Sequence, residues 1–236
     1  MDSALAFTRG PLFTACFLLM ILGLGRLVLL RAWEYRQSWR RASSDRFPVG
    51  KALRDIAVWL FPLARIYRVS QVIGVMSFLF HIGLILIPIF LADHVMLWSR
   101  GVRVSWWTLP HPAADVLTLL TIITALGLFS IRTFHPAARF MSQAADYLLL
   151  VLLTVPFVSG FLASHPVWNL FSYKATMLVH VLSGNLVMAL MPFTKLSHAV
   201  LFPFERVSSE VYWRFPAGAG DHVSIALHGR KEAAFP

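Results

Sequence analysis

Five long apolar stretches, nearly free of charge, constrain this chain more than any other feature. A helix that crosses the hydrocarbon core of a bilayer needs about 20 apolar residues. Charged residues make up only 14% of the 236 residues, against roughly 25% in a soluble domain. The sequence therefore predicts an all-α integral membrane protein with a bundle of five transmembrane helices and no room for a separate catalytic domain. The predicted spans are 11–30, 69–98, 113–133, 144–164 and 174–202.

Basic residues between the first two stretches predict the orientation of the bundle. Positions 31–68 contain nine arginine and lysine residues against three acidic ones, and the positive-inside rule places such a loop in the cytoplasm. Five spans then put the N-terminus outside and the C-terminus in the cytoplasm. We expect residues 1–206 to form the membrane domain and 207–236 to form a cytoplasmic tail that is extended or clasped by a partner. Apolar positions within 49–68 predict an amphipathic helix on the inner surface.

The cysteine content and the charge distribution exclude several classes of protein. Cys16 is the single cysteine, so the chain forms no internal disulfide and holds no iron–sulfur cluster through its own thiolates. No C-x-x-C-H motif is present, and any haem is therefore held non-covalently. The net charge of +10 lies mainly in the predicted inner segments, which indicates membrane topology and no nucleic-acid partner.

The nine histidines fall into groups with different expected roles. His111, His135 and His165 each precede a proline at a predicted span end, which favours an interface cap. His222 and His228 lie in the polar tail and are expected to be solvated. The remaining four lie in the two longest apolar stretches, where ionisable residues are functional candidates. These four are His81, His94, His180 and His198.

The spacing of these four histidines predicts two facing pairs. His180 and His198 are separated by five helical turns, about 27 Å, and would share one face of a continuous helix. His81 and His94 are about 20 Å apart on an antiparallel helix. The geometry pairs His81 with His198 at the inner side and His94 with His180 at the outer side, as in two stacked b haems. Thirteen residues turn an ideal helix about 220° past a whole number of turns, so the outer pair requires a kink at Pro88 or an unwound end. A single haem is the alternative.

The sequence around these histidines resembles a known family. The runs FHIGLILIPIFLADHV (Phe80–Val95), VHVLSGNLVMALMPFTKLSHAVLFPFER (Val179–Arg206) and AFTRGPL (Ala6–Leu12) are similar to membrane cytochrome b subunits related to the gamma subunit of respiratory nitrate reductase. The similarity is closer to the branch in dissimilatory sulfite-reductase-linked, transmembrane cytochrome c3 and membrane-bound hydrogenase complexes. Its most specific part is PFTKLSH (Pro192–His198).

This resemblance implies a cofactor content and a set of partners. It implies two b haems held by His81, His94, His180 and His198, with a quinone or menaquinone site beside the outer haem. It also implies an iron–sulfur partner subunit at the cytoplasmic face and a location in a bacterial or archaeal inner membrane. The 13 residues between the two histidines of the second span exceed the spacing of the nitrate reductase gamma pattern, so the chain departs from nitrate reductase itself.

Five charged residues are candidates for binding the cofactors. Asp93 and Lys174 are candidates for a quinone site near the outer haem, because such a site needs groups that hydrogen-bond the head group and exchange its protons. Arg100 and Arg103 are candidates for the propionates of the outer haem, or else extend to the membrane interface. Lys195, three residues before His198, is a candidate for an inner propionate.

The predicted function is that of a dihaem cytochrome b membrane anchor in a respiratory redox complex, which is not catalytic alone. It would carry electrons between the quinone pool and the iron–sulfur partner. Two alternatives remain open: a proton-coupled transporter, and a structural anchor whose histidines hydrogen-bond neighbouring helices. The sequence does not specify the terminal donor or acceptor, the direction of electron flow or the quinone type.

Overall fold

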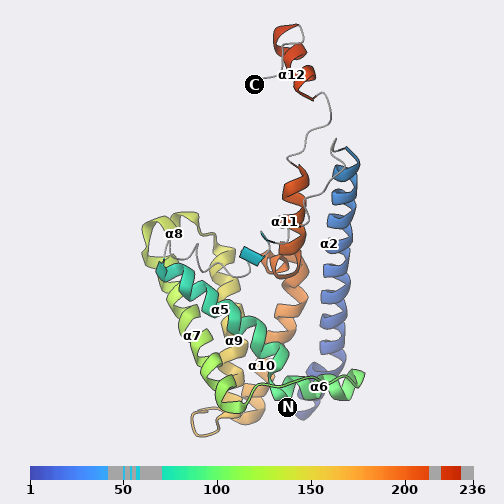
Figure 1. Cartoon of the computed structure of the whole chain (residues 1–236). Coiled ribbons are helices and arrows are strands. Elements are labelled where there is room, and N and C mark those ends of the chain that lie inside the picture. Colours follow the sequence, from blue (N-terminus) through green and yellow to red (C-terminus); the bar gives the residue numbers. More distant parts are fainter. Residues whose placement is uncertain (42–49, 51–53, 55–56, 59–70, 213–218, 230–236) are drawn as a thin grey trace. The chain divides into compact units, whose positions relative to one another are not determined.

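Only helices are assigned in the part of the chain that the computed structural model describes, which is residues 1–41, 50, 54, 57–58, 71–212 and 219–229 (Figure 1). Five helices are long and apolar enough to cross a membrane. The predictions of an all-α chain and of five candidate spans are thus confirmed, while the orientation stays a prediction. Most of the segment predicted as an amphipathic helix, 49–68, lies outside the described residues. The five candidates are Asp2–Ser38, Gln71–Phe90, His111–Phe134, Ala144–Ser164 and Tyr173–Phe193.

The chain divides into two compact units, Met1–Leu18 with Leu63–Ala189 (unit 1) and Leu19–Pro62 with Leu190–Pro236 (unit 2). Unit 1 contains four of the candidate spans in whole or large part. Helices α7 and α9 agree with the predicted third and fourth spans to within two residues at each end. The elements of unit 1 are α1 (Asp2–Phe7), a π-helical turn (Thr8–Leu12), the start of α2 (Phe13–Arg41), α5 (Gln71–Phe90), α6 (Ala92–Val102), α7 (His111–Phe134), α8 (Pro136–Met141), α9 (Ala144–Ser164) and α10 (Tyr173–Leu190).

Helix α7 packs against both α5 and α9. Helices α5 and α7 approach closely at Gly83, where an added Cβ atom would lie 1.6 Å from Oγ1 of Thr121. Thr118, Thr121 and Thr124 are buried on α7. Each hydroxyl donates to a carbonyl of its own helix, so the threonines add no unsatisfied polar group to an apolar bundle. Small residues of this kind let the helix backbones pack tightly.

The predicted second span, 69–98, is not one continuous helix. Helix α5 ends at Phe90, Leu91 is extended with ψ 131°, and α6 begins at Ala92. Pro88 lies in the last turn of α5, where it lacks an N–H donor and crowds the preceding turn. Helix α6 therefore leaves in a new direction (Figure 1), and the prediction of a kinked or unwound end near Pro88 is confirmed.

Two donors from the following loop satisfy carbonyls released by this break. The indole N–H of Trp106 donates to the carbonyl of Ile89 at 2.9 Å. The main-chain N–H of Leu109 donates to the carbonyl of Phe90 at 2.8 Å. A backbone carbonyl without a partner is costly at membrane depth, so the loop stabilises the break.

Unit 2 contains a second interruption, and it contradicts the prediction of a continuous helix over 174–202. Helix α10 ends at Leu190, two 3₁₀ turns follow, and Thr194 between them is extended. The hydroxyl of Thr194 donates to the carbonyl of Leu190 and accepts the N–H of Leu196. Pro192 fills the space beside Gly23 of α2, where an added Cβ atom would lie 2.6 Å from Cβ of Pro192. The other elements of unit 2 are η2 (Met191–Phe193), η3 (Lys195–Ser197), α11 (His198–Tyr212) and α12 (Ala219–His228).

The described part of the C-terminal segment is helical, so the prediction of an extended tail is wrong there. Helix α11 continues past position 206 to Tyr212, and α12 occupies Ala219–His228. Residues 213–218 and 230–236 are not among the described residues.

Candidate functional site

Two of the four predicted ligand histidines lie face to face within unit 1. The imidazole rings of His94 on α6 and His180 on α10 are nearly parallel, with an angle of 16° between their planes. Their ring centres are 6.0 Å apart. The break after α5 determines the direction of α6, and with it the position of the His94 ring. The structure thus brings together two residues that are distant in the sequence.

Helix α9 holds the ring of His180. Its Nδ1–H donates to the carbonyl of Pro156 at 2.8 Å, which leaves the lone pair of the neutral ring on Nε2. Gly160, one turn further along α9, provides the space for the ring, because an added Cβ atom would lie 2.9 Å from Cε1 of His180. A ring held by a main-chain carbonyl at one nitrogen is the arrangement that orients metal-binding histidines.

Main-chain carbonyls at the end of α5 contact the ring of His94 in a similar way. The carbonyls of Ile87 and Pro88 interact with its ring, and the carbonyl of Pro88 lies in the last turn of α5, next to the break. These main-chain contacts orient the ring. A neutral imidazole is the form that binds a metal.

The distance between the two ring centres, taken alone, matches that of two imidazoles that hold one metal ion. A metal ion bonds an imidazole nitrogen at about 2 Å, so two imidazoles on opposite sides of one ion have ring centres about 6 Å apart. The observed 6.0 Å agrees with that value. No group of three or more histidine, cysteine or acidic residues with metal-binding geometry occurs among the described residues. Two imidazoles would be the protein donor set of a haem held by two histidines.

The other two predicted ligands show the same main-chain contact but lie in different units. Nδ1 of His81 in unit 1 donates to the carbonyl of Ser77 at 2.6 Å, and Nδ1 of His198 in unit 2 donates to the carbonyl of Lys195 at 2.5 Å. Each contact fixes the tautomer with its lone pair on Nε2. Their mutual pairing stays a prediction.

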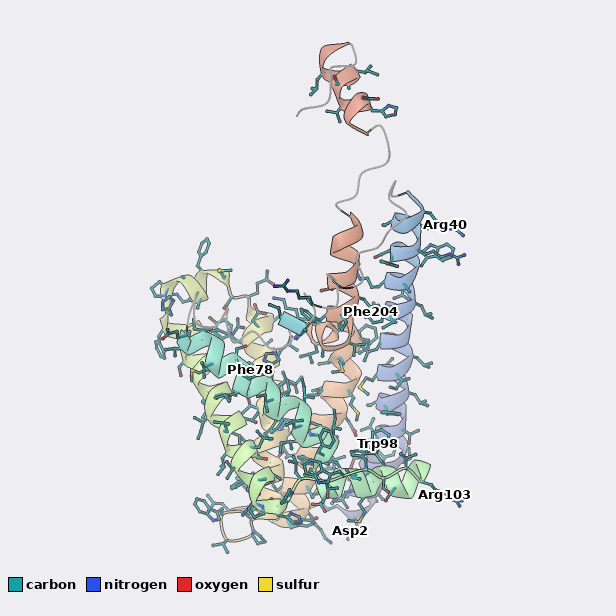
Figure 2. The ribbon with its side chains drawn as sticks, in the orientation of Figure 1. Asp2, Arg40, Phe78, Trp98, Arg103 and Phe204 are labelled. Atoms are coloured by element: carbon teal, nitrogen blue, oxygen red, sulfur yellow. The ribbon has the colours of Figure 1, made fainter. Side chains whose placement is uncertain are left out.

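The five charged candidates are dispersed. Asp93 is exposed in the first turn of α6, and Lys174 pairs with Asp2 at 2.7 Å. Arg103 is exposed at the end of α6 (Figure 2), while the side chain of Arg100 is outside the described part of the chain. Lys195 is exposed in unit 2.

An apolar cavity of about 520 Å³ lies between α7, α9 and α10. Neither Asp93 nor Lys174 lines it. Its position therefore does not coincide with the residues predicted for a quinone site.

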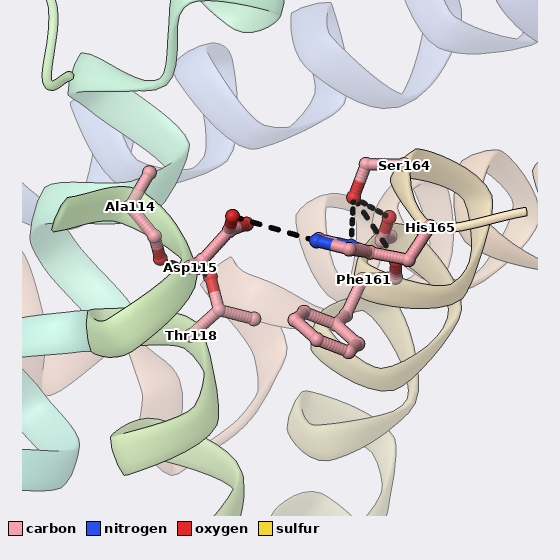
Figure 3. Close-up of polar contacts among 7 residues, drawn as sticks. Ala114, Asp115, Thr118, Phe161, Ser164 and His165 are labelled. Atoms are coloured by element: carbon pink, nitrogen blue, oxygen red, sulfur yellow. Dashed lines mark hydrogen bonds and ion pairs between the residues drawn. The ribbon is translucent and has the colours of Figure 1, made fainter. Parts of the chain in front are cut away.

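His165 has a different environment from His180 (Figure 3). Its Nδ1 lies 2.9 Å from the carbonyl of Phe161, and its Nε2 lies 3.4 Å from a carboxylate oxygen of Asp115. Its ring stacks on that of Phe161 with centres 4.2 Å apart. Both nitrogens of His165 contact protein oxygens, so this residue connects α7 and α9.

Sequence reasoning missed the N-terminal segment as part of the site. The side-chain amide of Asn185 on α10 donates to the carbonyl of Thr8 at 3.0 Å, and both residues are buried. Arg9, the next residue, lines a cavity beside the start of α10. The run AFTRGPL and a polar asparagine inside an apolar stretch were the available signals, but neither indicates that the two segments meet.

The fold is consistent with a helical multi-pass membrane protein, because five helices of the described chain are long and apolar enough to span a membrane. A protein of Nitratidesulfovibrio vulgaris is 34% identical over 206 residues, which cover 85% of this chain and 89% of the relative. The chain belongs to the same family as this relative, whose description gives no function. No family model matches the chain. No solved structure matches it either.

Proposed function

We propose that this chain is the dihaem cytochrome b subunit of a respiratory redox complex in a bacterial or archaeal inner membrane. The observation that carries the proposal is the pair of partly buried, nearly parallel imidazoles of His94 and His180, whose centres are 6.0 Å apart. His81 and His198, each held through Nδ1 by a main-chain carbonyl, would bind a second haem. A bound haem supplies a carrier for one electron at a time.

The residues of the site have separate tasks in this proposal. The carbonyl of Pro156 and the space at Gly160 fix the ring of His180, and the end of α5 fixes the ring of His94. Ligands held rigidly in both oxidation states reduce the reorganisation that electron transfer requires. The chain itself performs no bond chemistry and connects two partners.

Those partners are a quinone and an iron–sulfur subunit. Asp93, exposed beside His94, supports a quinol site at this end, where its carboxylate would hydrogen-bond the head group and accept a proton. Lys174 is engaged by Asp2 and would act there only after leaving that ion pair. Since Cys16 is the single cysteine, the cytoplasmic acceptor or donor cluster would belong to another subunit.

A haem count tests the proposal directly. The chain would be produced in a haem-replete host and purified in detergent, and a pyridine haemochrome spectrum would give haem b per polypeptide. We expect two haems in the wild-type chain and loss of only the second haem in His198→Ala. A colourless protein would reject the cytochrome assignment in favour of a transporter or structural anchor, and one haem per chain would reject the assignment of His81 and His198.

An inhibitor titration tests the position of the quinone site. Quinol analogues are expected to shift the spectrum of the haem that His180→Ala removes. A shift confined to the haem that His198→Ala removes would place the site at the opposite end.

A further inference from the structure

The N-terminal segment runs along α10 and contacts it on both sides of His180. Asp2 pairs with Lys174 at the start of α10, and the carbonyl of Thr8 binds the amide of Asn185 further along the helix. His180 lies between these two contacts in the sequence of α10. The segment is therefore fixed parallel to α10, next to the helical turns that hold the His180 ring.

A cavity of about 330 Å³ lies between this segment and the start of α10. It is lined by Asp2, Leu5, Ala6, Arg9, Tyr173 and Lys174. The cavity thus has two cationic side chains, one carboxylate and one phenol, and it lies on the part of α10 that precedes His180.

The two cations of the cavity differ in their partners. Lys174 is neutralised by Asp2, with Nζ 2.7 Å from the carboxylate. No carboxylate in the described ranges pairs with Arg9. The cavity therefore has a net positive charge at its guanidinium. A guanidinium binds carboxylates in a planar, bidentate geometry.

We propose that Arg9 binds a propionate carboxylate of the haem held by His94 and His180. This inference rests on the proposed function. It assigns this role to an arginine of the N-terminal segment, and Arg103 at the end of α6 (Figure 2) is the comparison. In this arrangement the guanidinium of Arg9 would neutralise the negative charge of a haem propionate. The hydrogen bond from Asn185 to the carbonyl of Thr8 would hold the N-terminal segment in place.

The test is a redox titration of the purified holoprotein in three separate variants, Arg9→Gln, Arg9→Lys and Arg103→Gln. Removal of a positive charge beside the haem favours its more positive, oxidised state. Arg9→Gln is therefore expected to lower the midpoint potential of the haem that His180→Ala removes, and to shift its propionate-bending band in resonance Raman spectra. Arg9→Lys is expected to retain most of the potential, and Arg103→Gln to change neither quantity.

A phospholipid phosphate is the other anion that this guanidinium would bind. The titration is therefore repeated in lipid-free dodecyl maltoside and in nanodiscs containing phosphatidylglycerol. An equal effect of Arg9→Gln in both media supports a propionate. An effect confined to the anionic nanodiscs overturns the proposal in favour of a lipid site.

Three further outcomes would overturn the inference. These are an unchanged potential and Raman band in Arg9→Gln with the haem bound, an equal shift in Arg103→Gln, and loss of this haem in both Arg9 variants. If Arg9→Gln loses the haem but Arg9→Lys retains it near the wild-type potential, the inference stands. A wild-type chain without haem rejects the proposed function as well, whereas a normal haem count with no response to Arg9 rejects only this inference.

Discussion

His180 and His165 each contact a carbonyl of α9 through Nδ1, yet their second ring nitrogens have different surroundings. The Nε2 atom of His165 lies 3.4 Å from the carboxylate of Asp115. This carboxylate can accept a hydrogen bond from an Nε2–H group. The ring of His180 instead faces the ring of His94 at 6.0 Å. The comparison teaches that a carbonyl at Nδ1 does not identify a metal ligand by itself. The group opposite the other nitrogen separates a structural histidine from a candidate ligand.

Replacement of the two histidines gives the largest expected difference. His180→Ala is expected to remove one of the two haems, because one axial ligand is lost. His165→Ala is expected to retain both haems. Haem per polypeptide and the difference spectrum of each variant would measure this. Equal haem loss in both variants would remove the distinction between the two histidines.

A smaller change at α9 sharpens the assignment of His180. In Gly160→Ala the new Cβ atom would lie 2.9 Å from Cε1 of His180, so the ring must move. We expect partial loss of the corresponding haem, or an altered spectrum, at nearly unchanged stability, since alanine favours a helix by up to about 1 kcal/mol over glycine.

Gly184→Ala on α10 is the matched control for this change. No atom lies within 4 Å of a Cβ added there, apart from its own helix and chain neighbours. The control is expected to have a wild-type spectrum. A wild-type spectrum in Gly160→Ala as well would show that the packing at His180 does not influence the haem.

The break between α5 and α6 is expected to have an intermediate effect. Trp106→Phe removes the donor to the carbonyl of Ile89 and should lower the free energy of unfolding by about 1 kcal/mol. The orientation of α6, and with it His94, should become less well defined. Trp107→Phe is the control, because Trp107 is 66% exposed. Thermal unfolding in detergent, followed by haem absorbance, would compare the two variants, and an equal loss in both would contradict this role of Trp106.

The smallest effect is expected at the structural histidine. Asp115→Asn removes a contact whose side chains are 41% and 28% exposed for Asp115 and His165. Exposed ion pairs contribute about 0.2–1 kcal/mol, so we expect a small loss of thermal stability and an unchanged haem content. A changed midpoint potential of either haem in this variant would contradict a purely structural role for the Asp115–His165 pair.

The sequence predicted the spans well where each one is a simple apolar run. The prediction for α9 agrees with Ala144–Ser164, because the run ends in polar residues on both sides. The break near Pro88 was anticipated, since the histidine spacing required it. The interruption at Leu190 was not anticipated, although Pro192 follows two residues later, because a proline inside an apolar run does not indicate whether the helix bends or ends there.

The site was predicted less completely than the spans. His94 and His180 were paired from the order of the helices, and the structure brings these two rings together. The contact of Pro156 and the role that we propose for Arg9 could not be anticipated. A carbonyl is present at every residue, and Arg9 is far from His180 in the sequence.

The sequence by itself determined the class of the protein, the number of candidate spans and the positions of the histidines along them. Burial in a bilayer depends on hydrophobicity summed over neighbouring residues, which is a local property that the sequence contains directly. Only the tertiary structure decided which imidazoles lie next to each other and which carbonyls orient them. These contacts depend on where helices break and how distant segments pack, and no local window of the sequence contains that information.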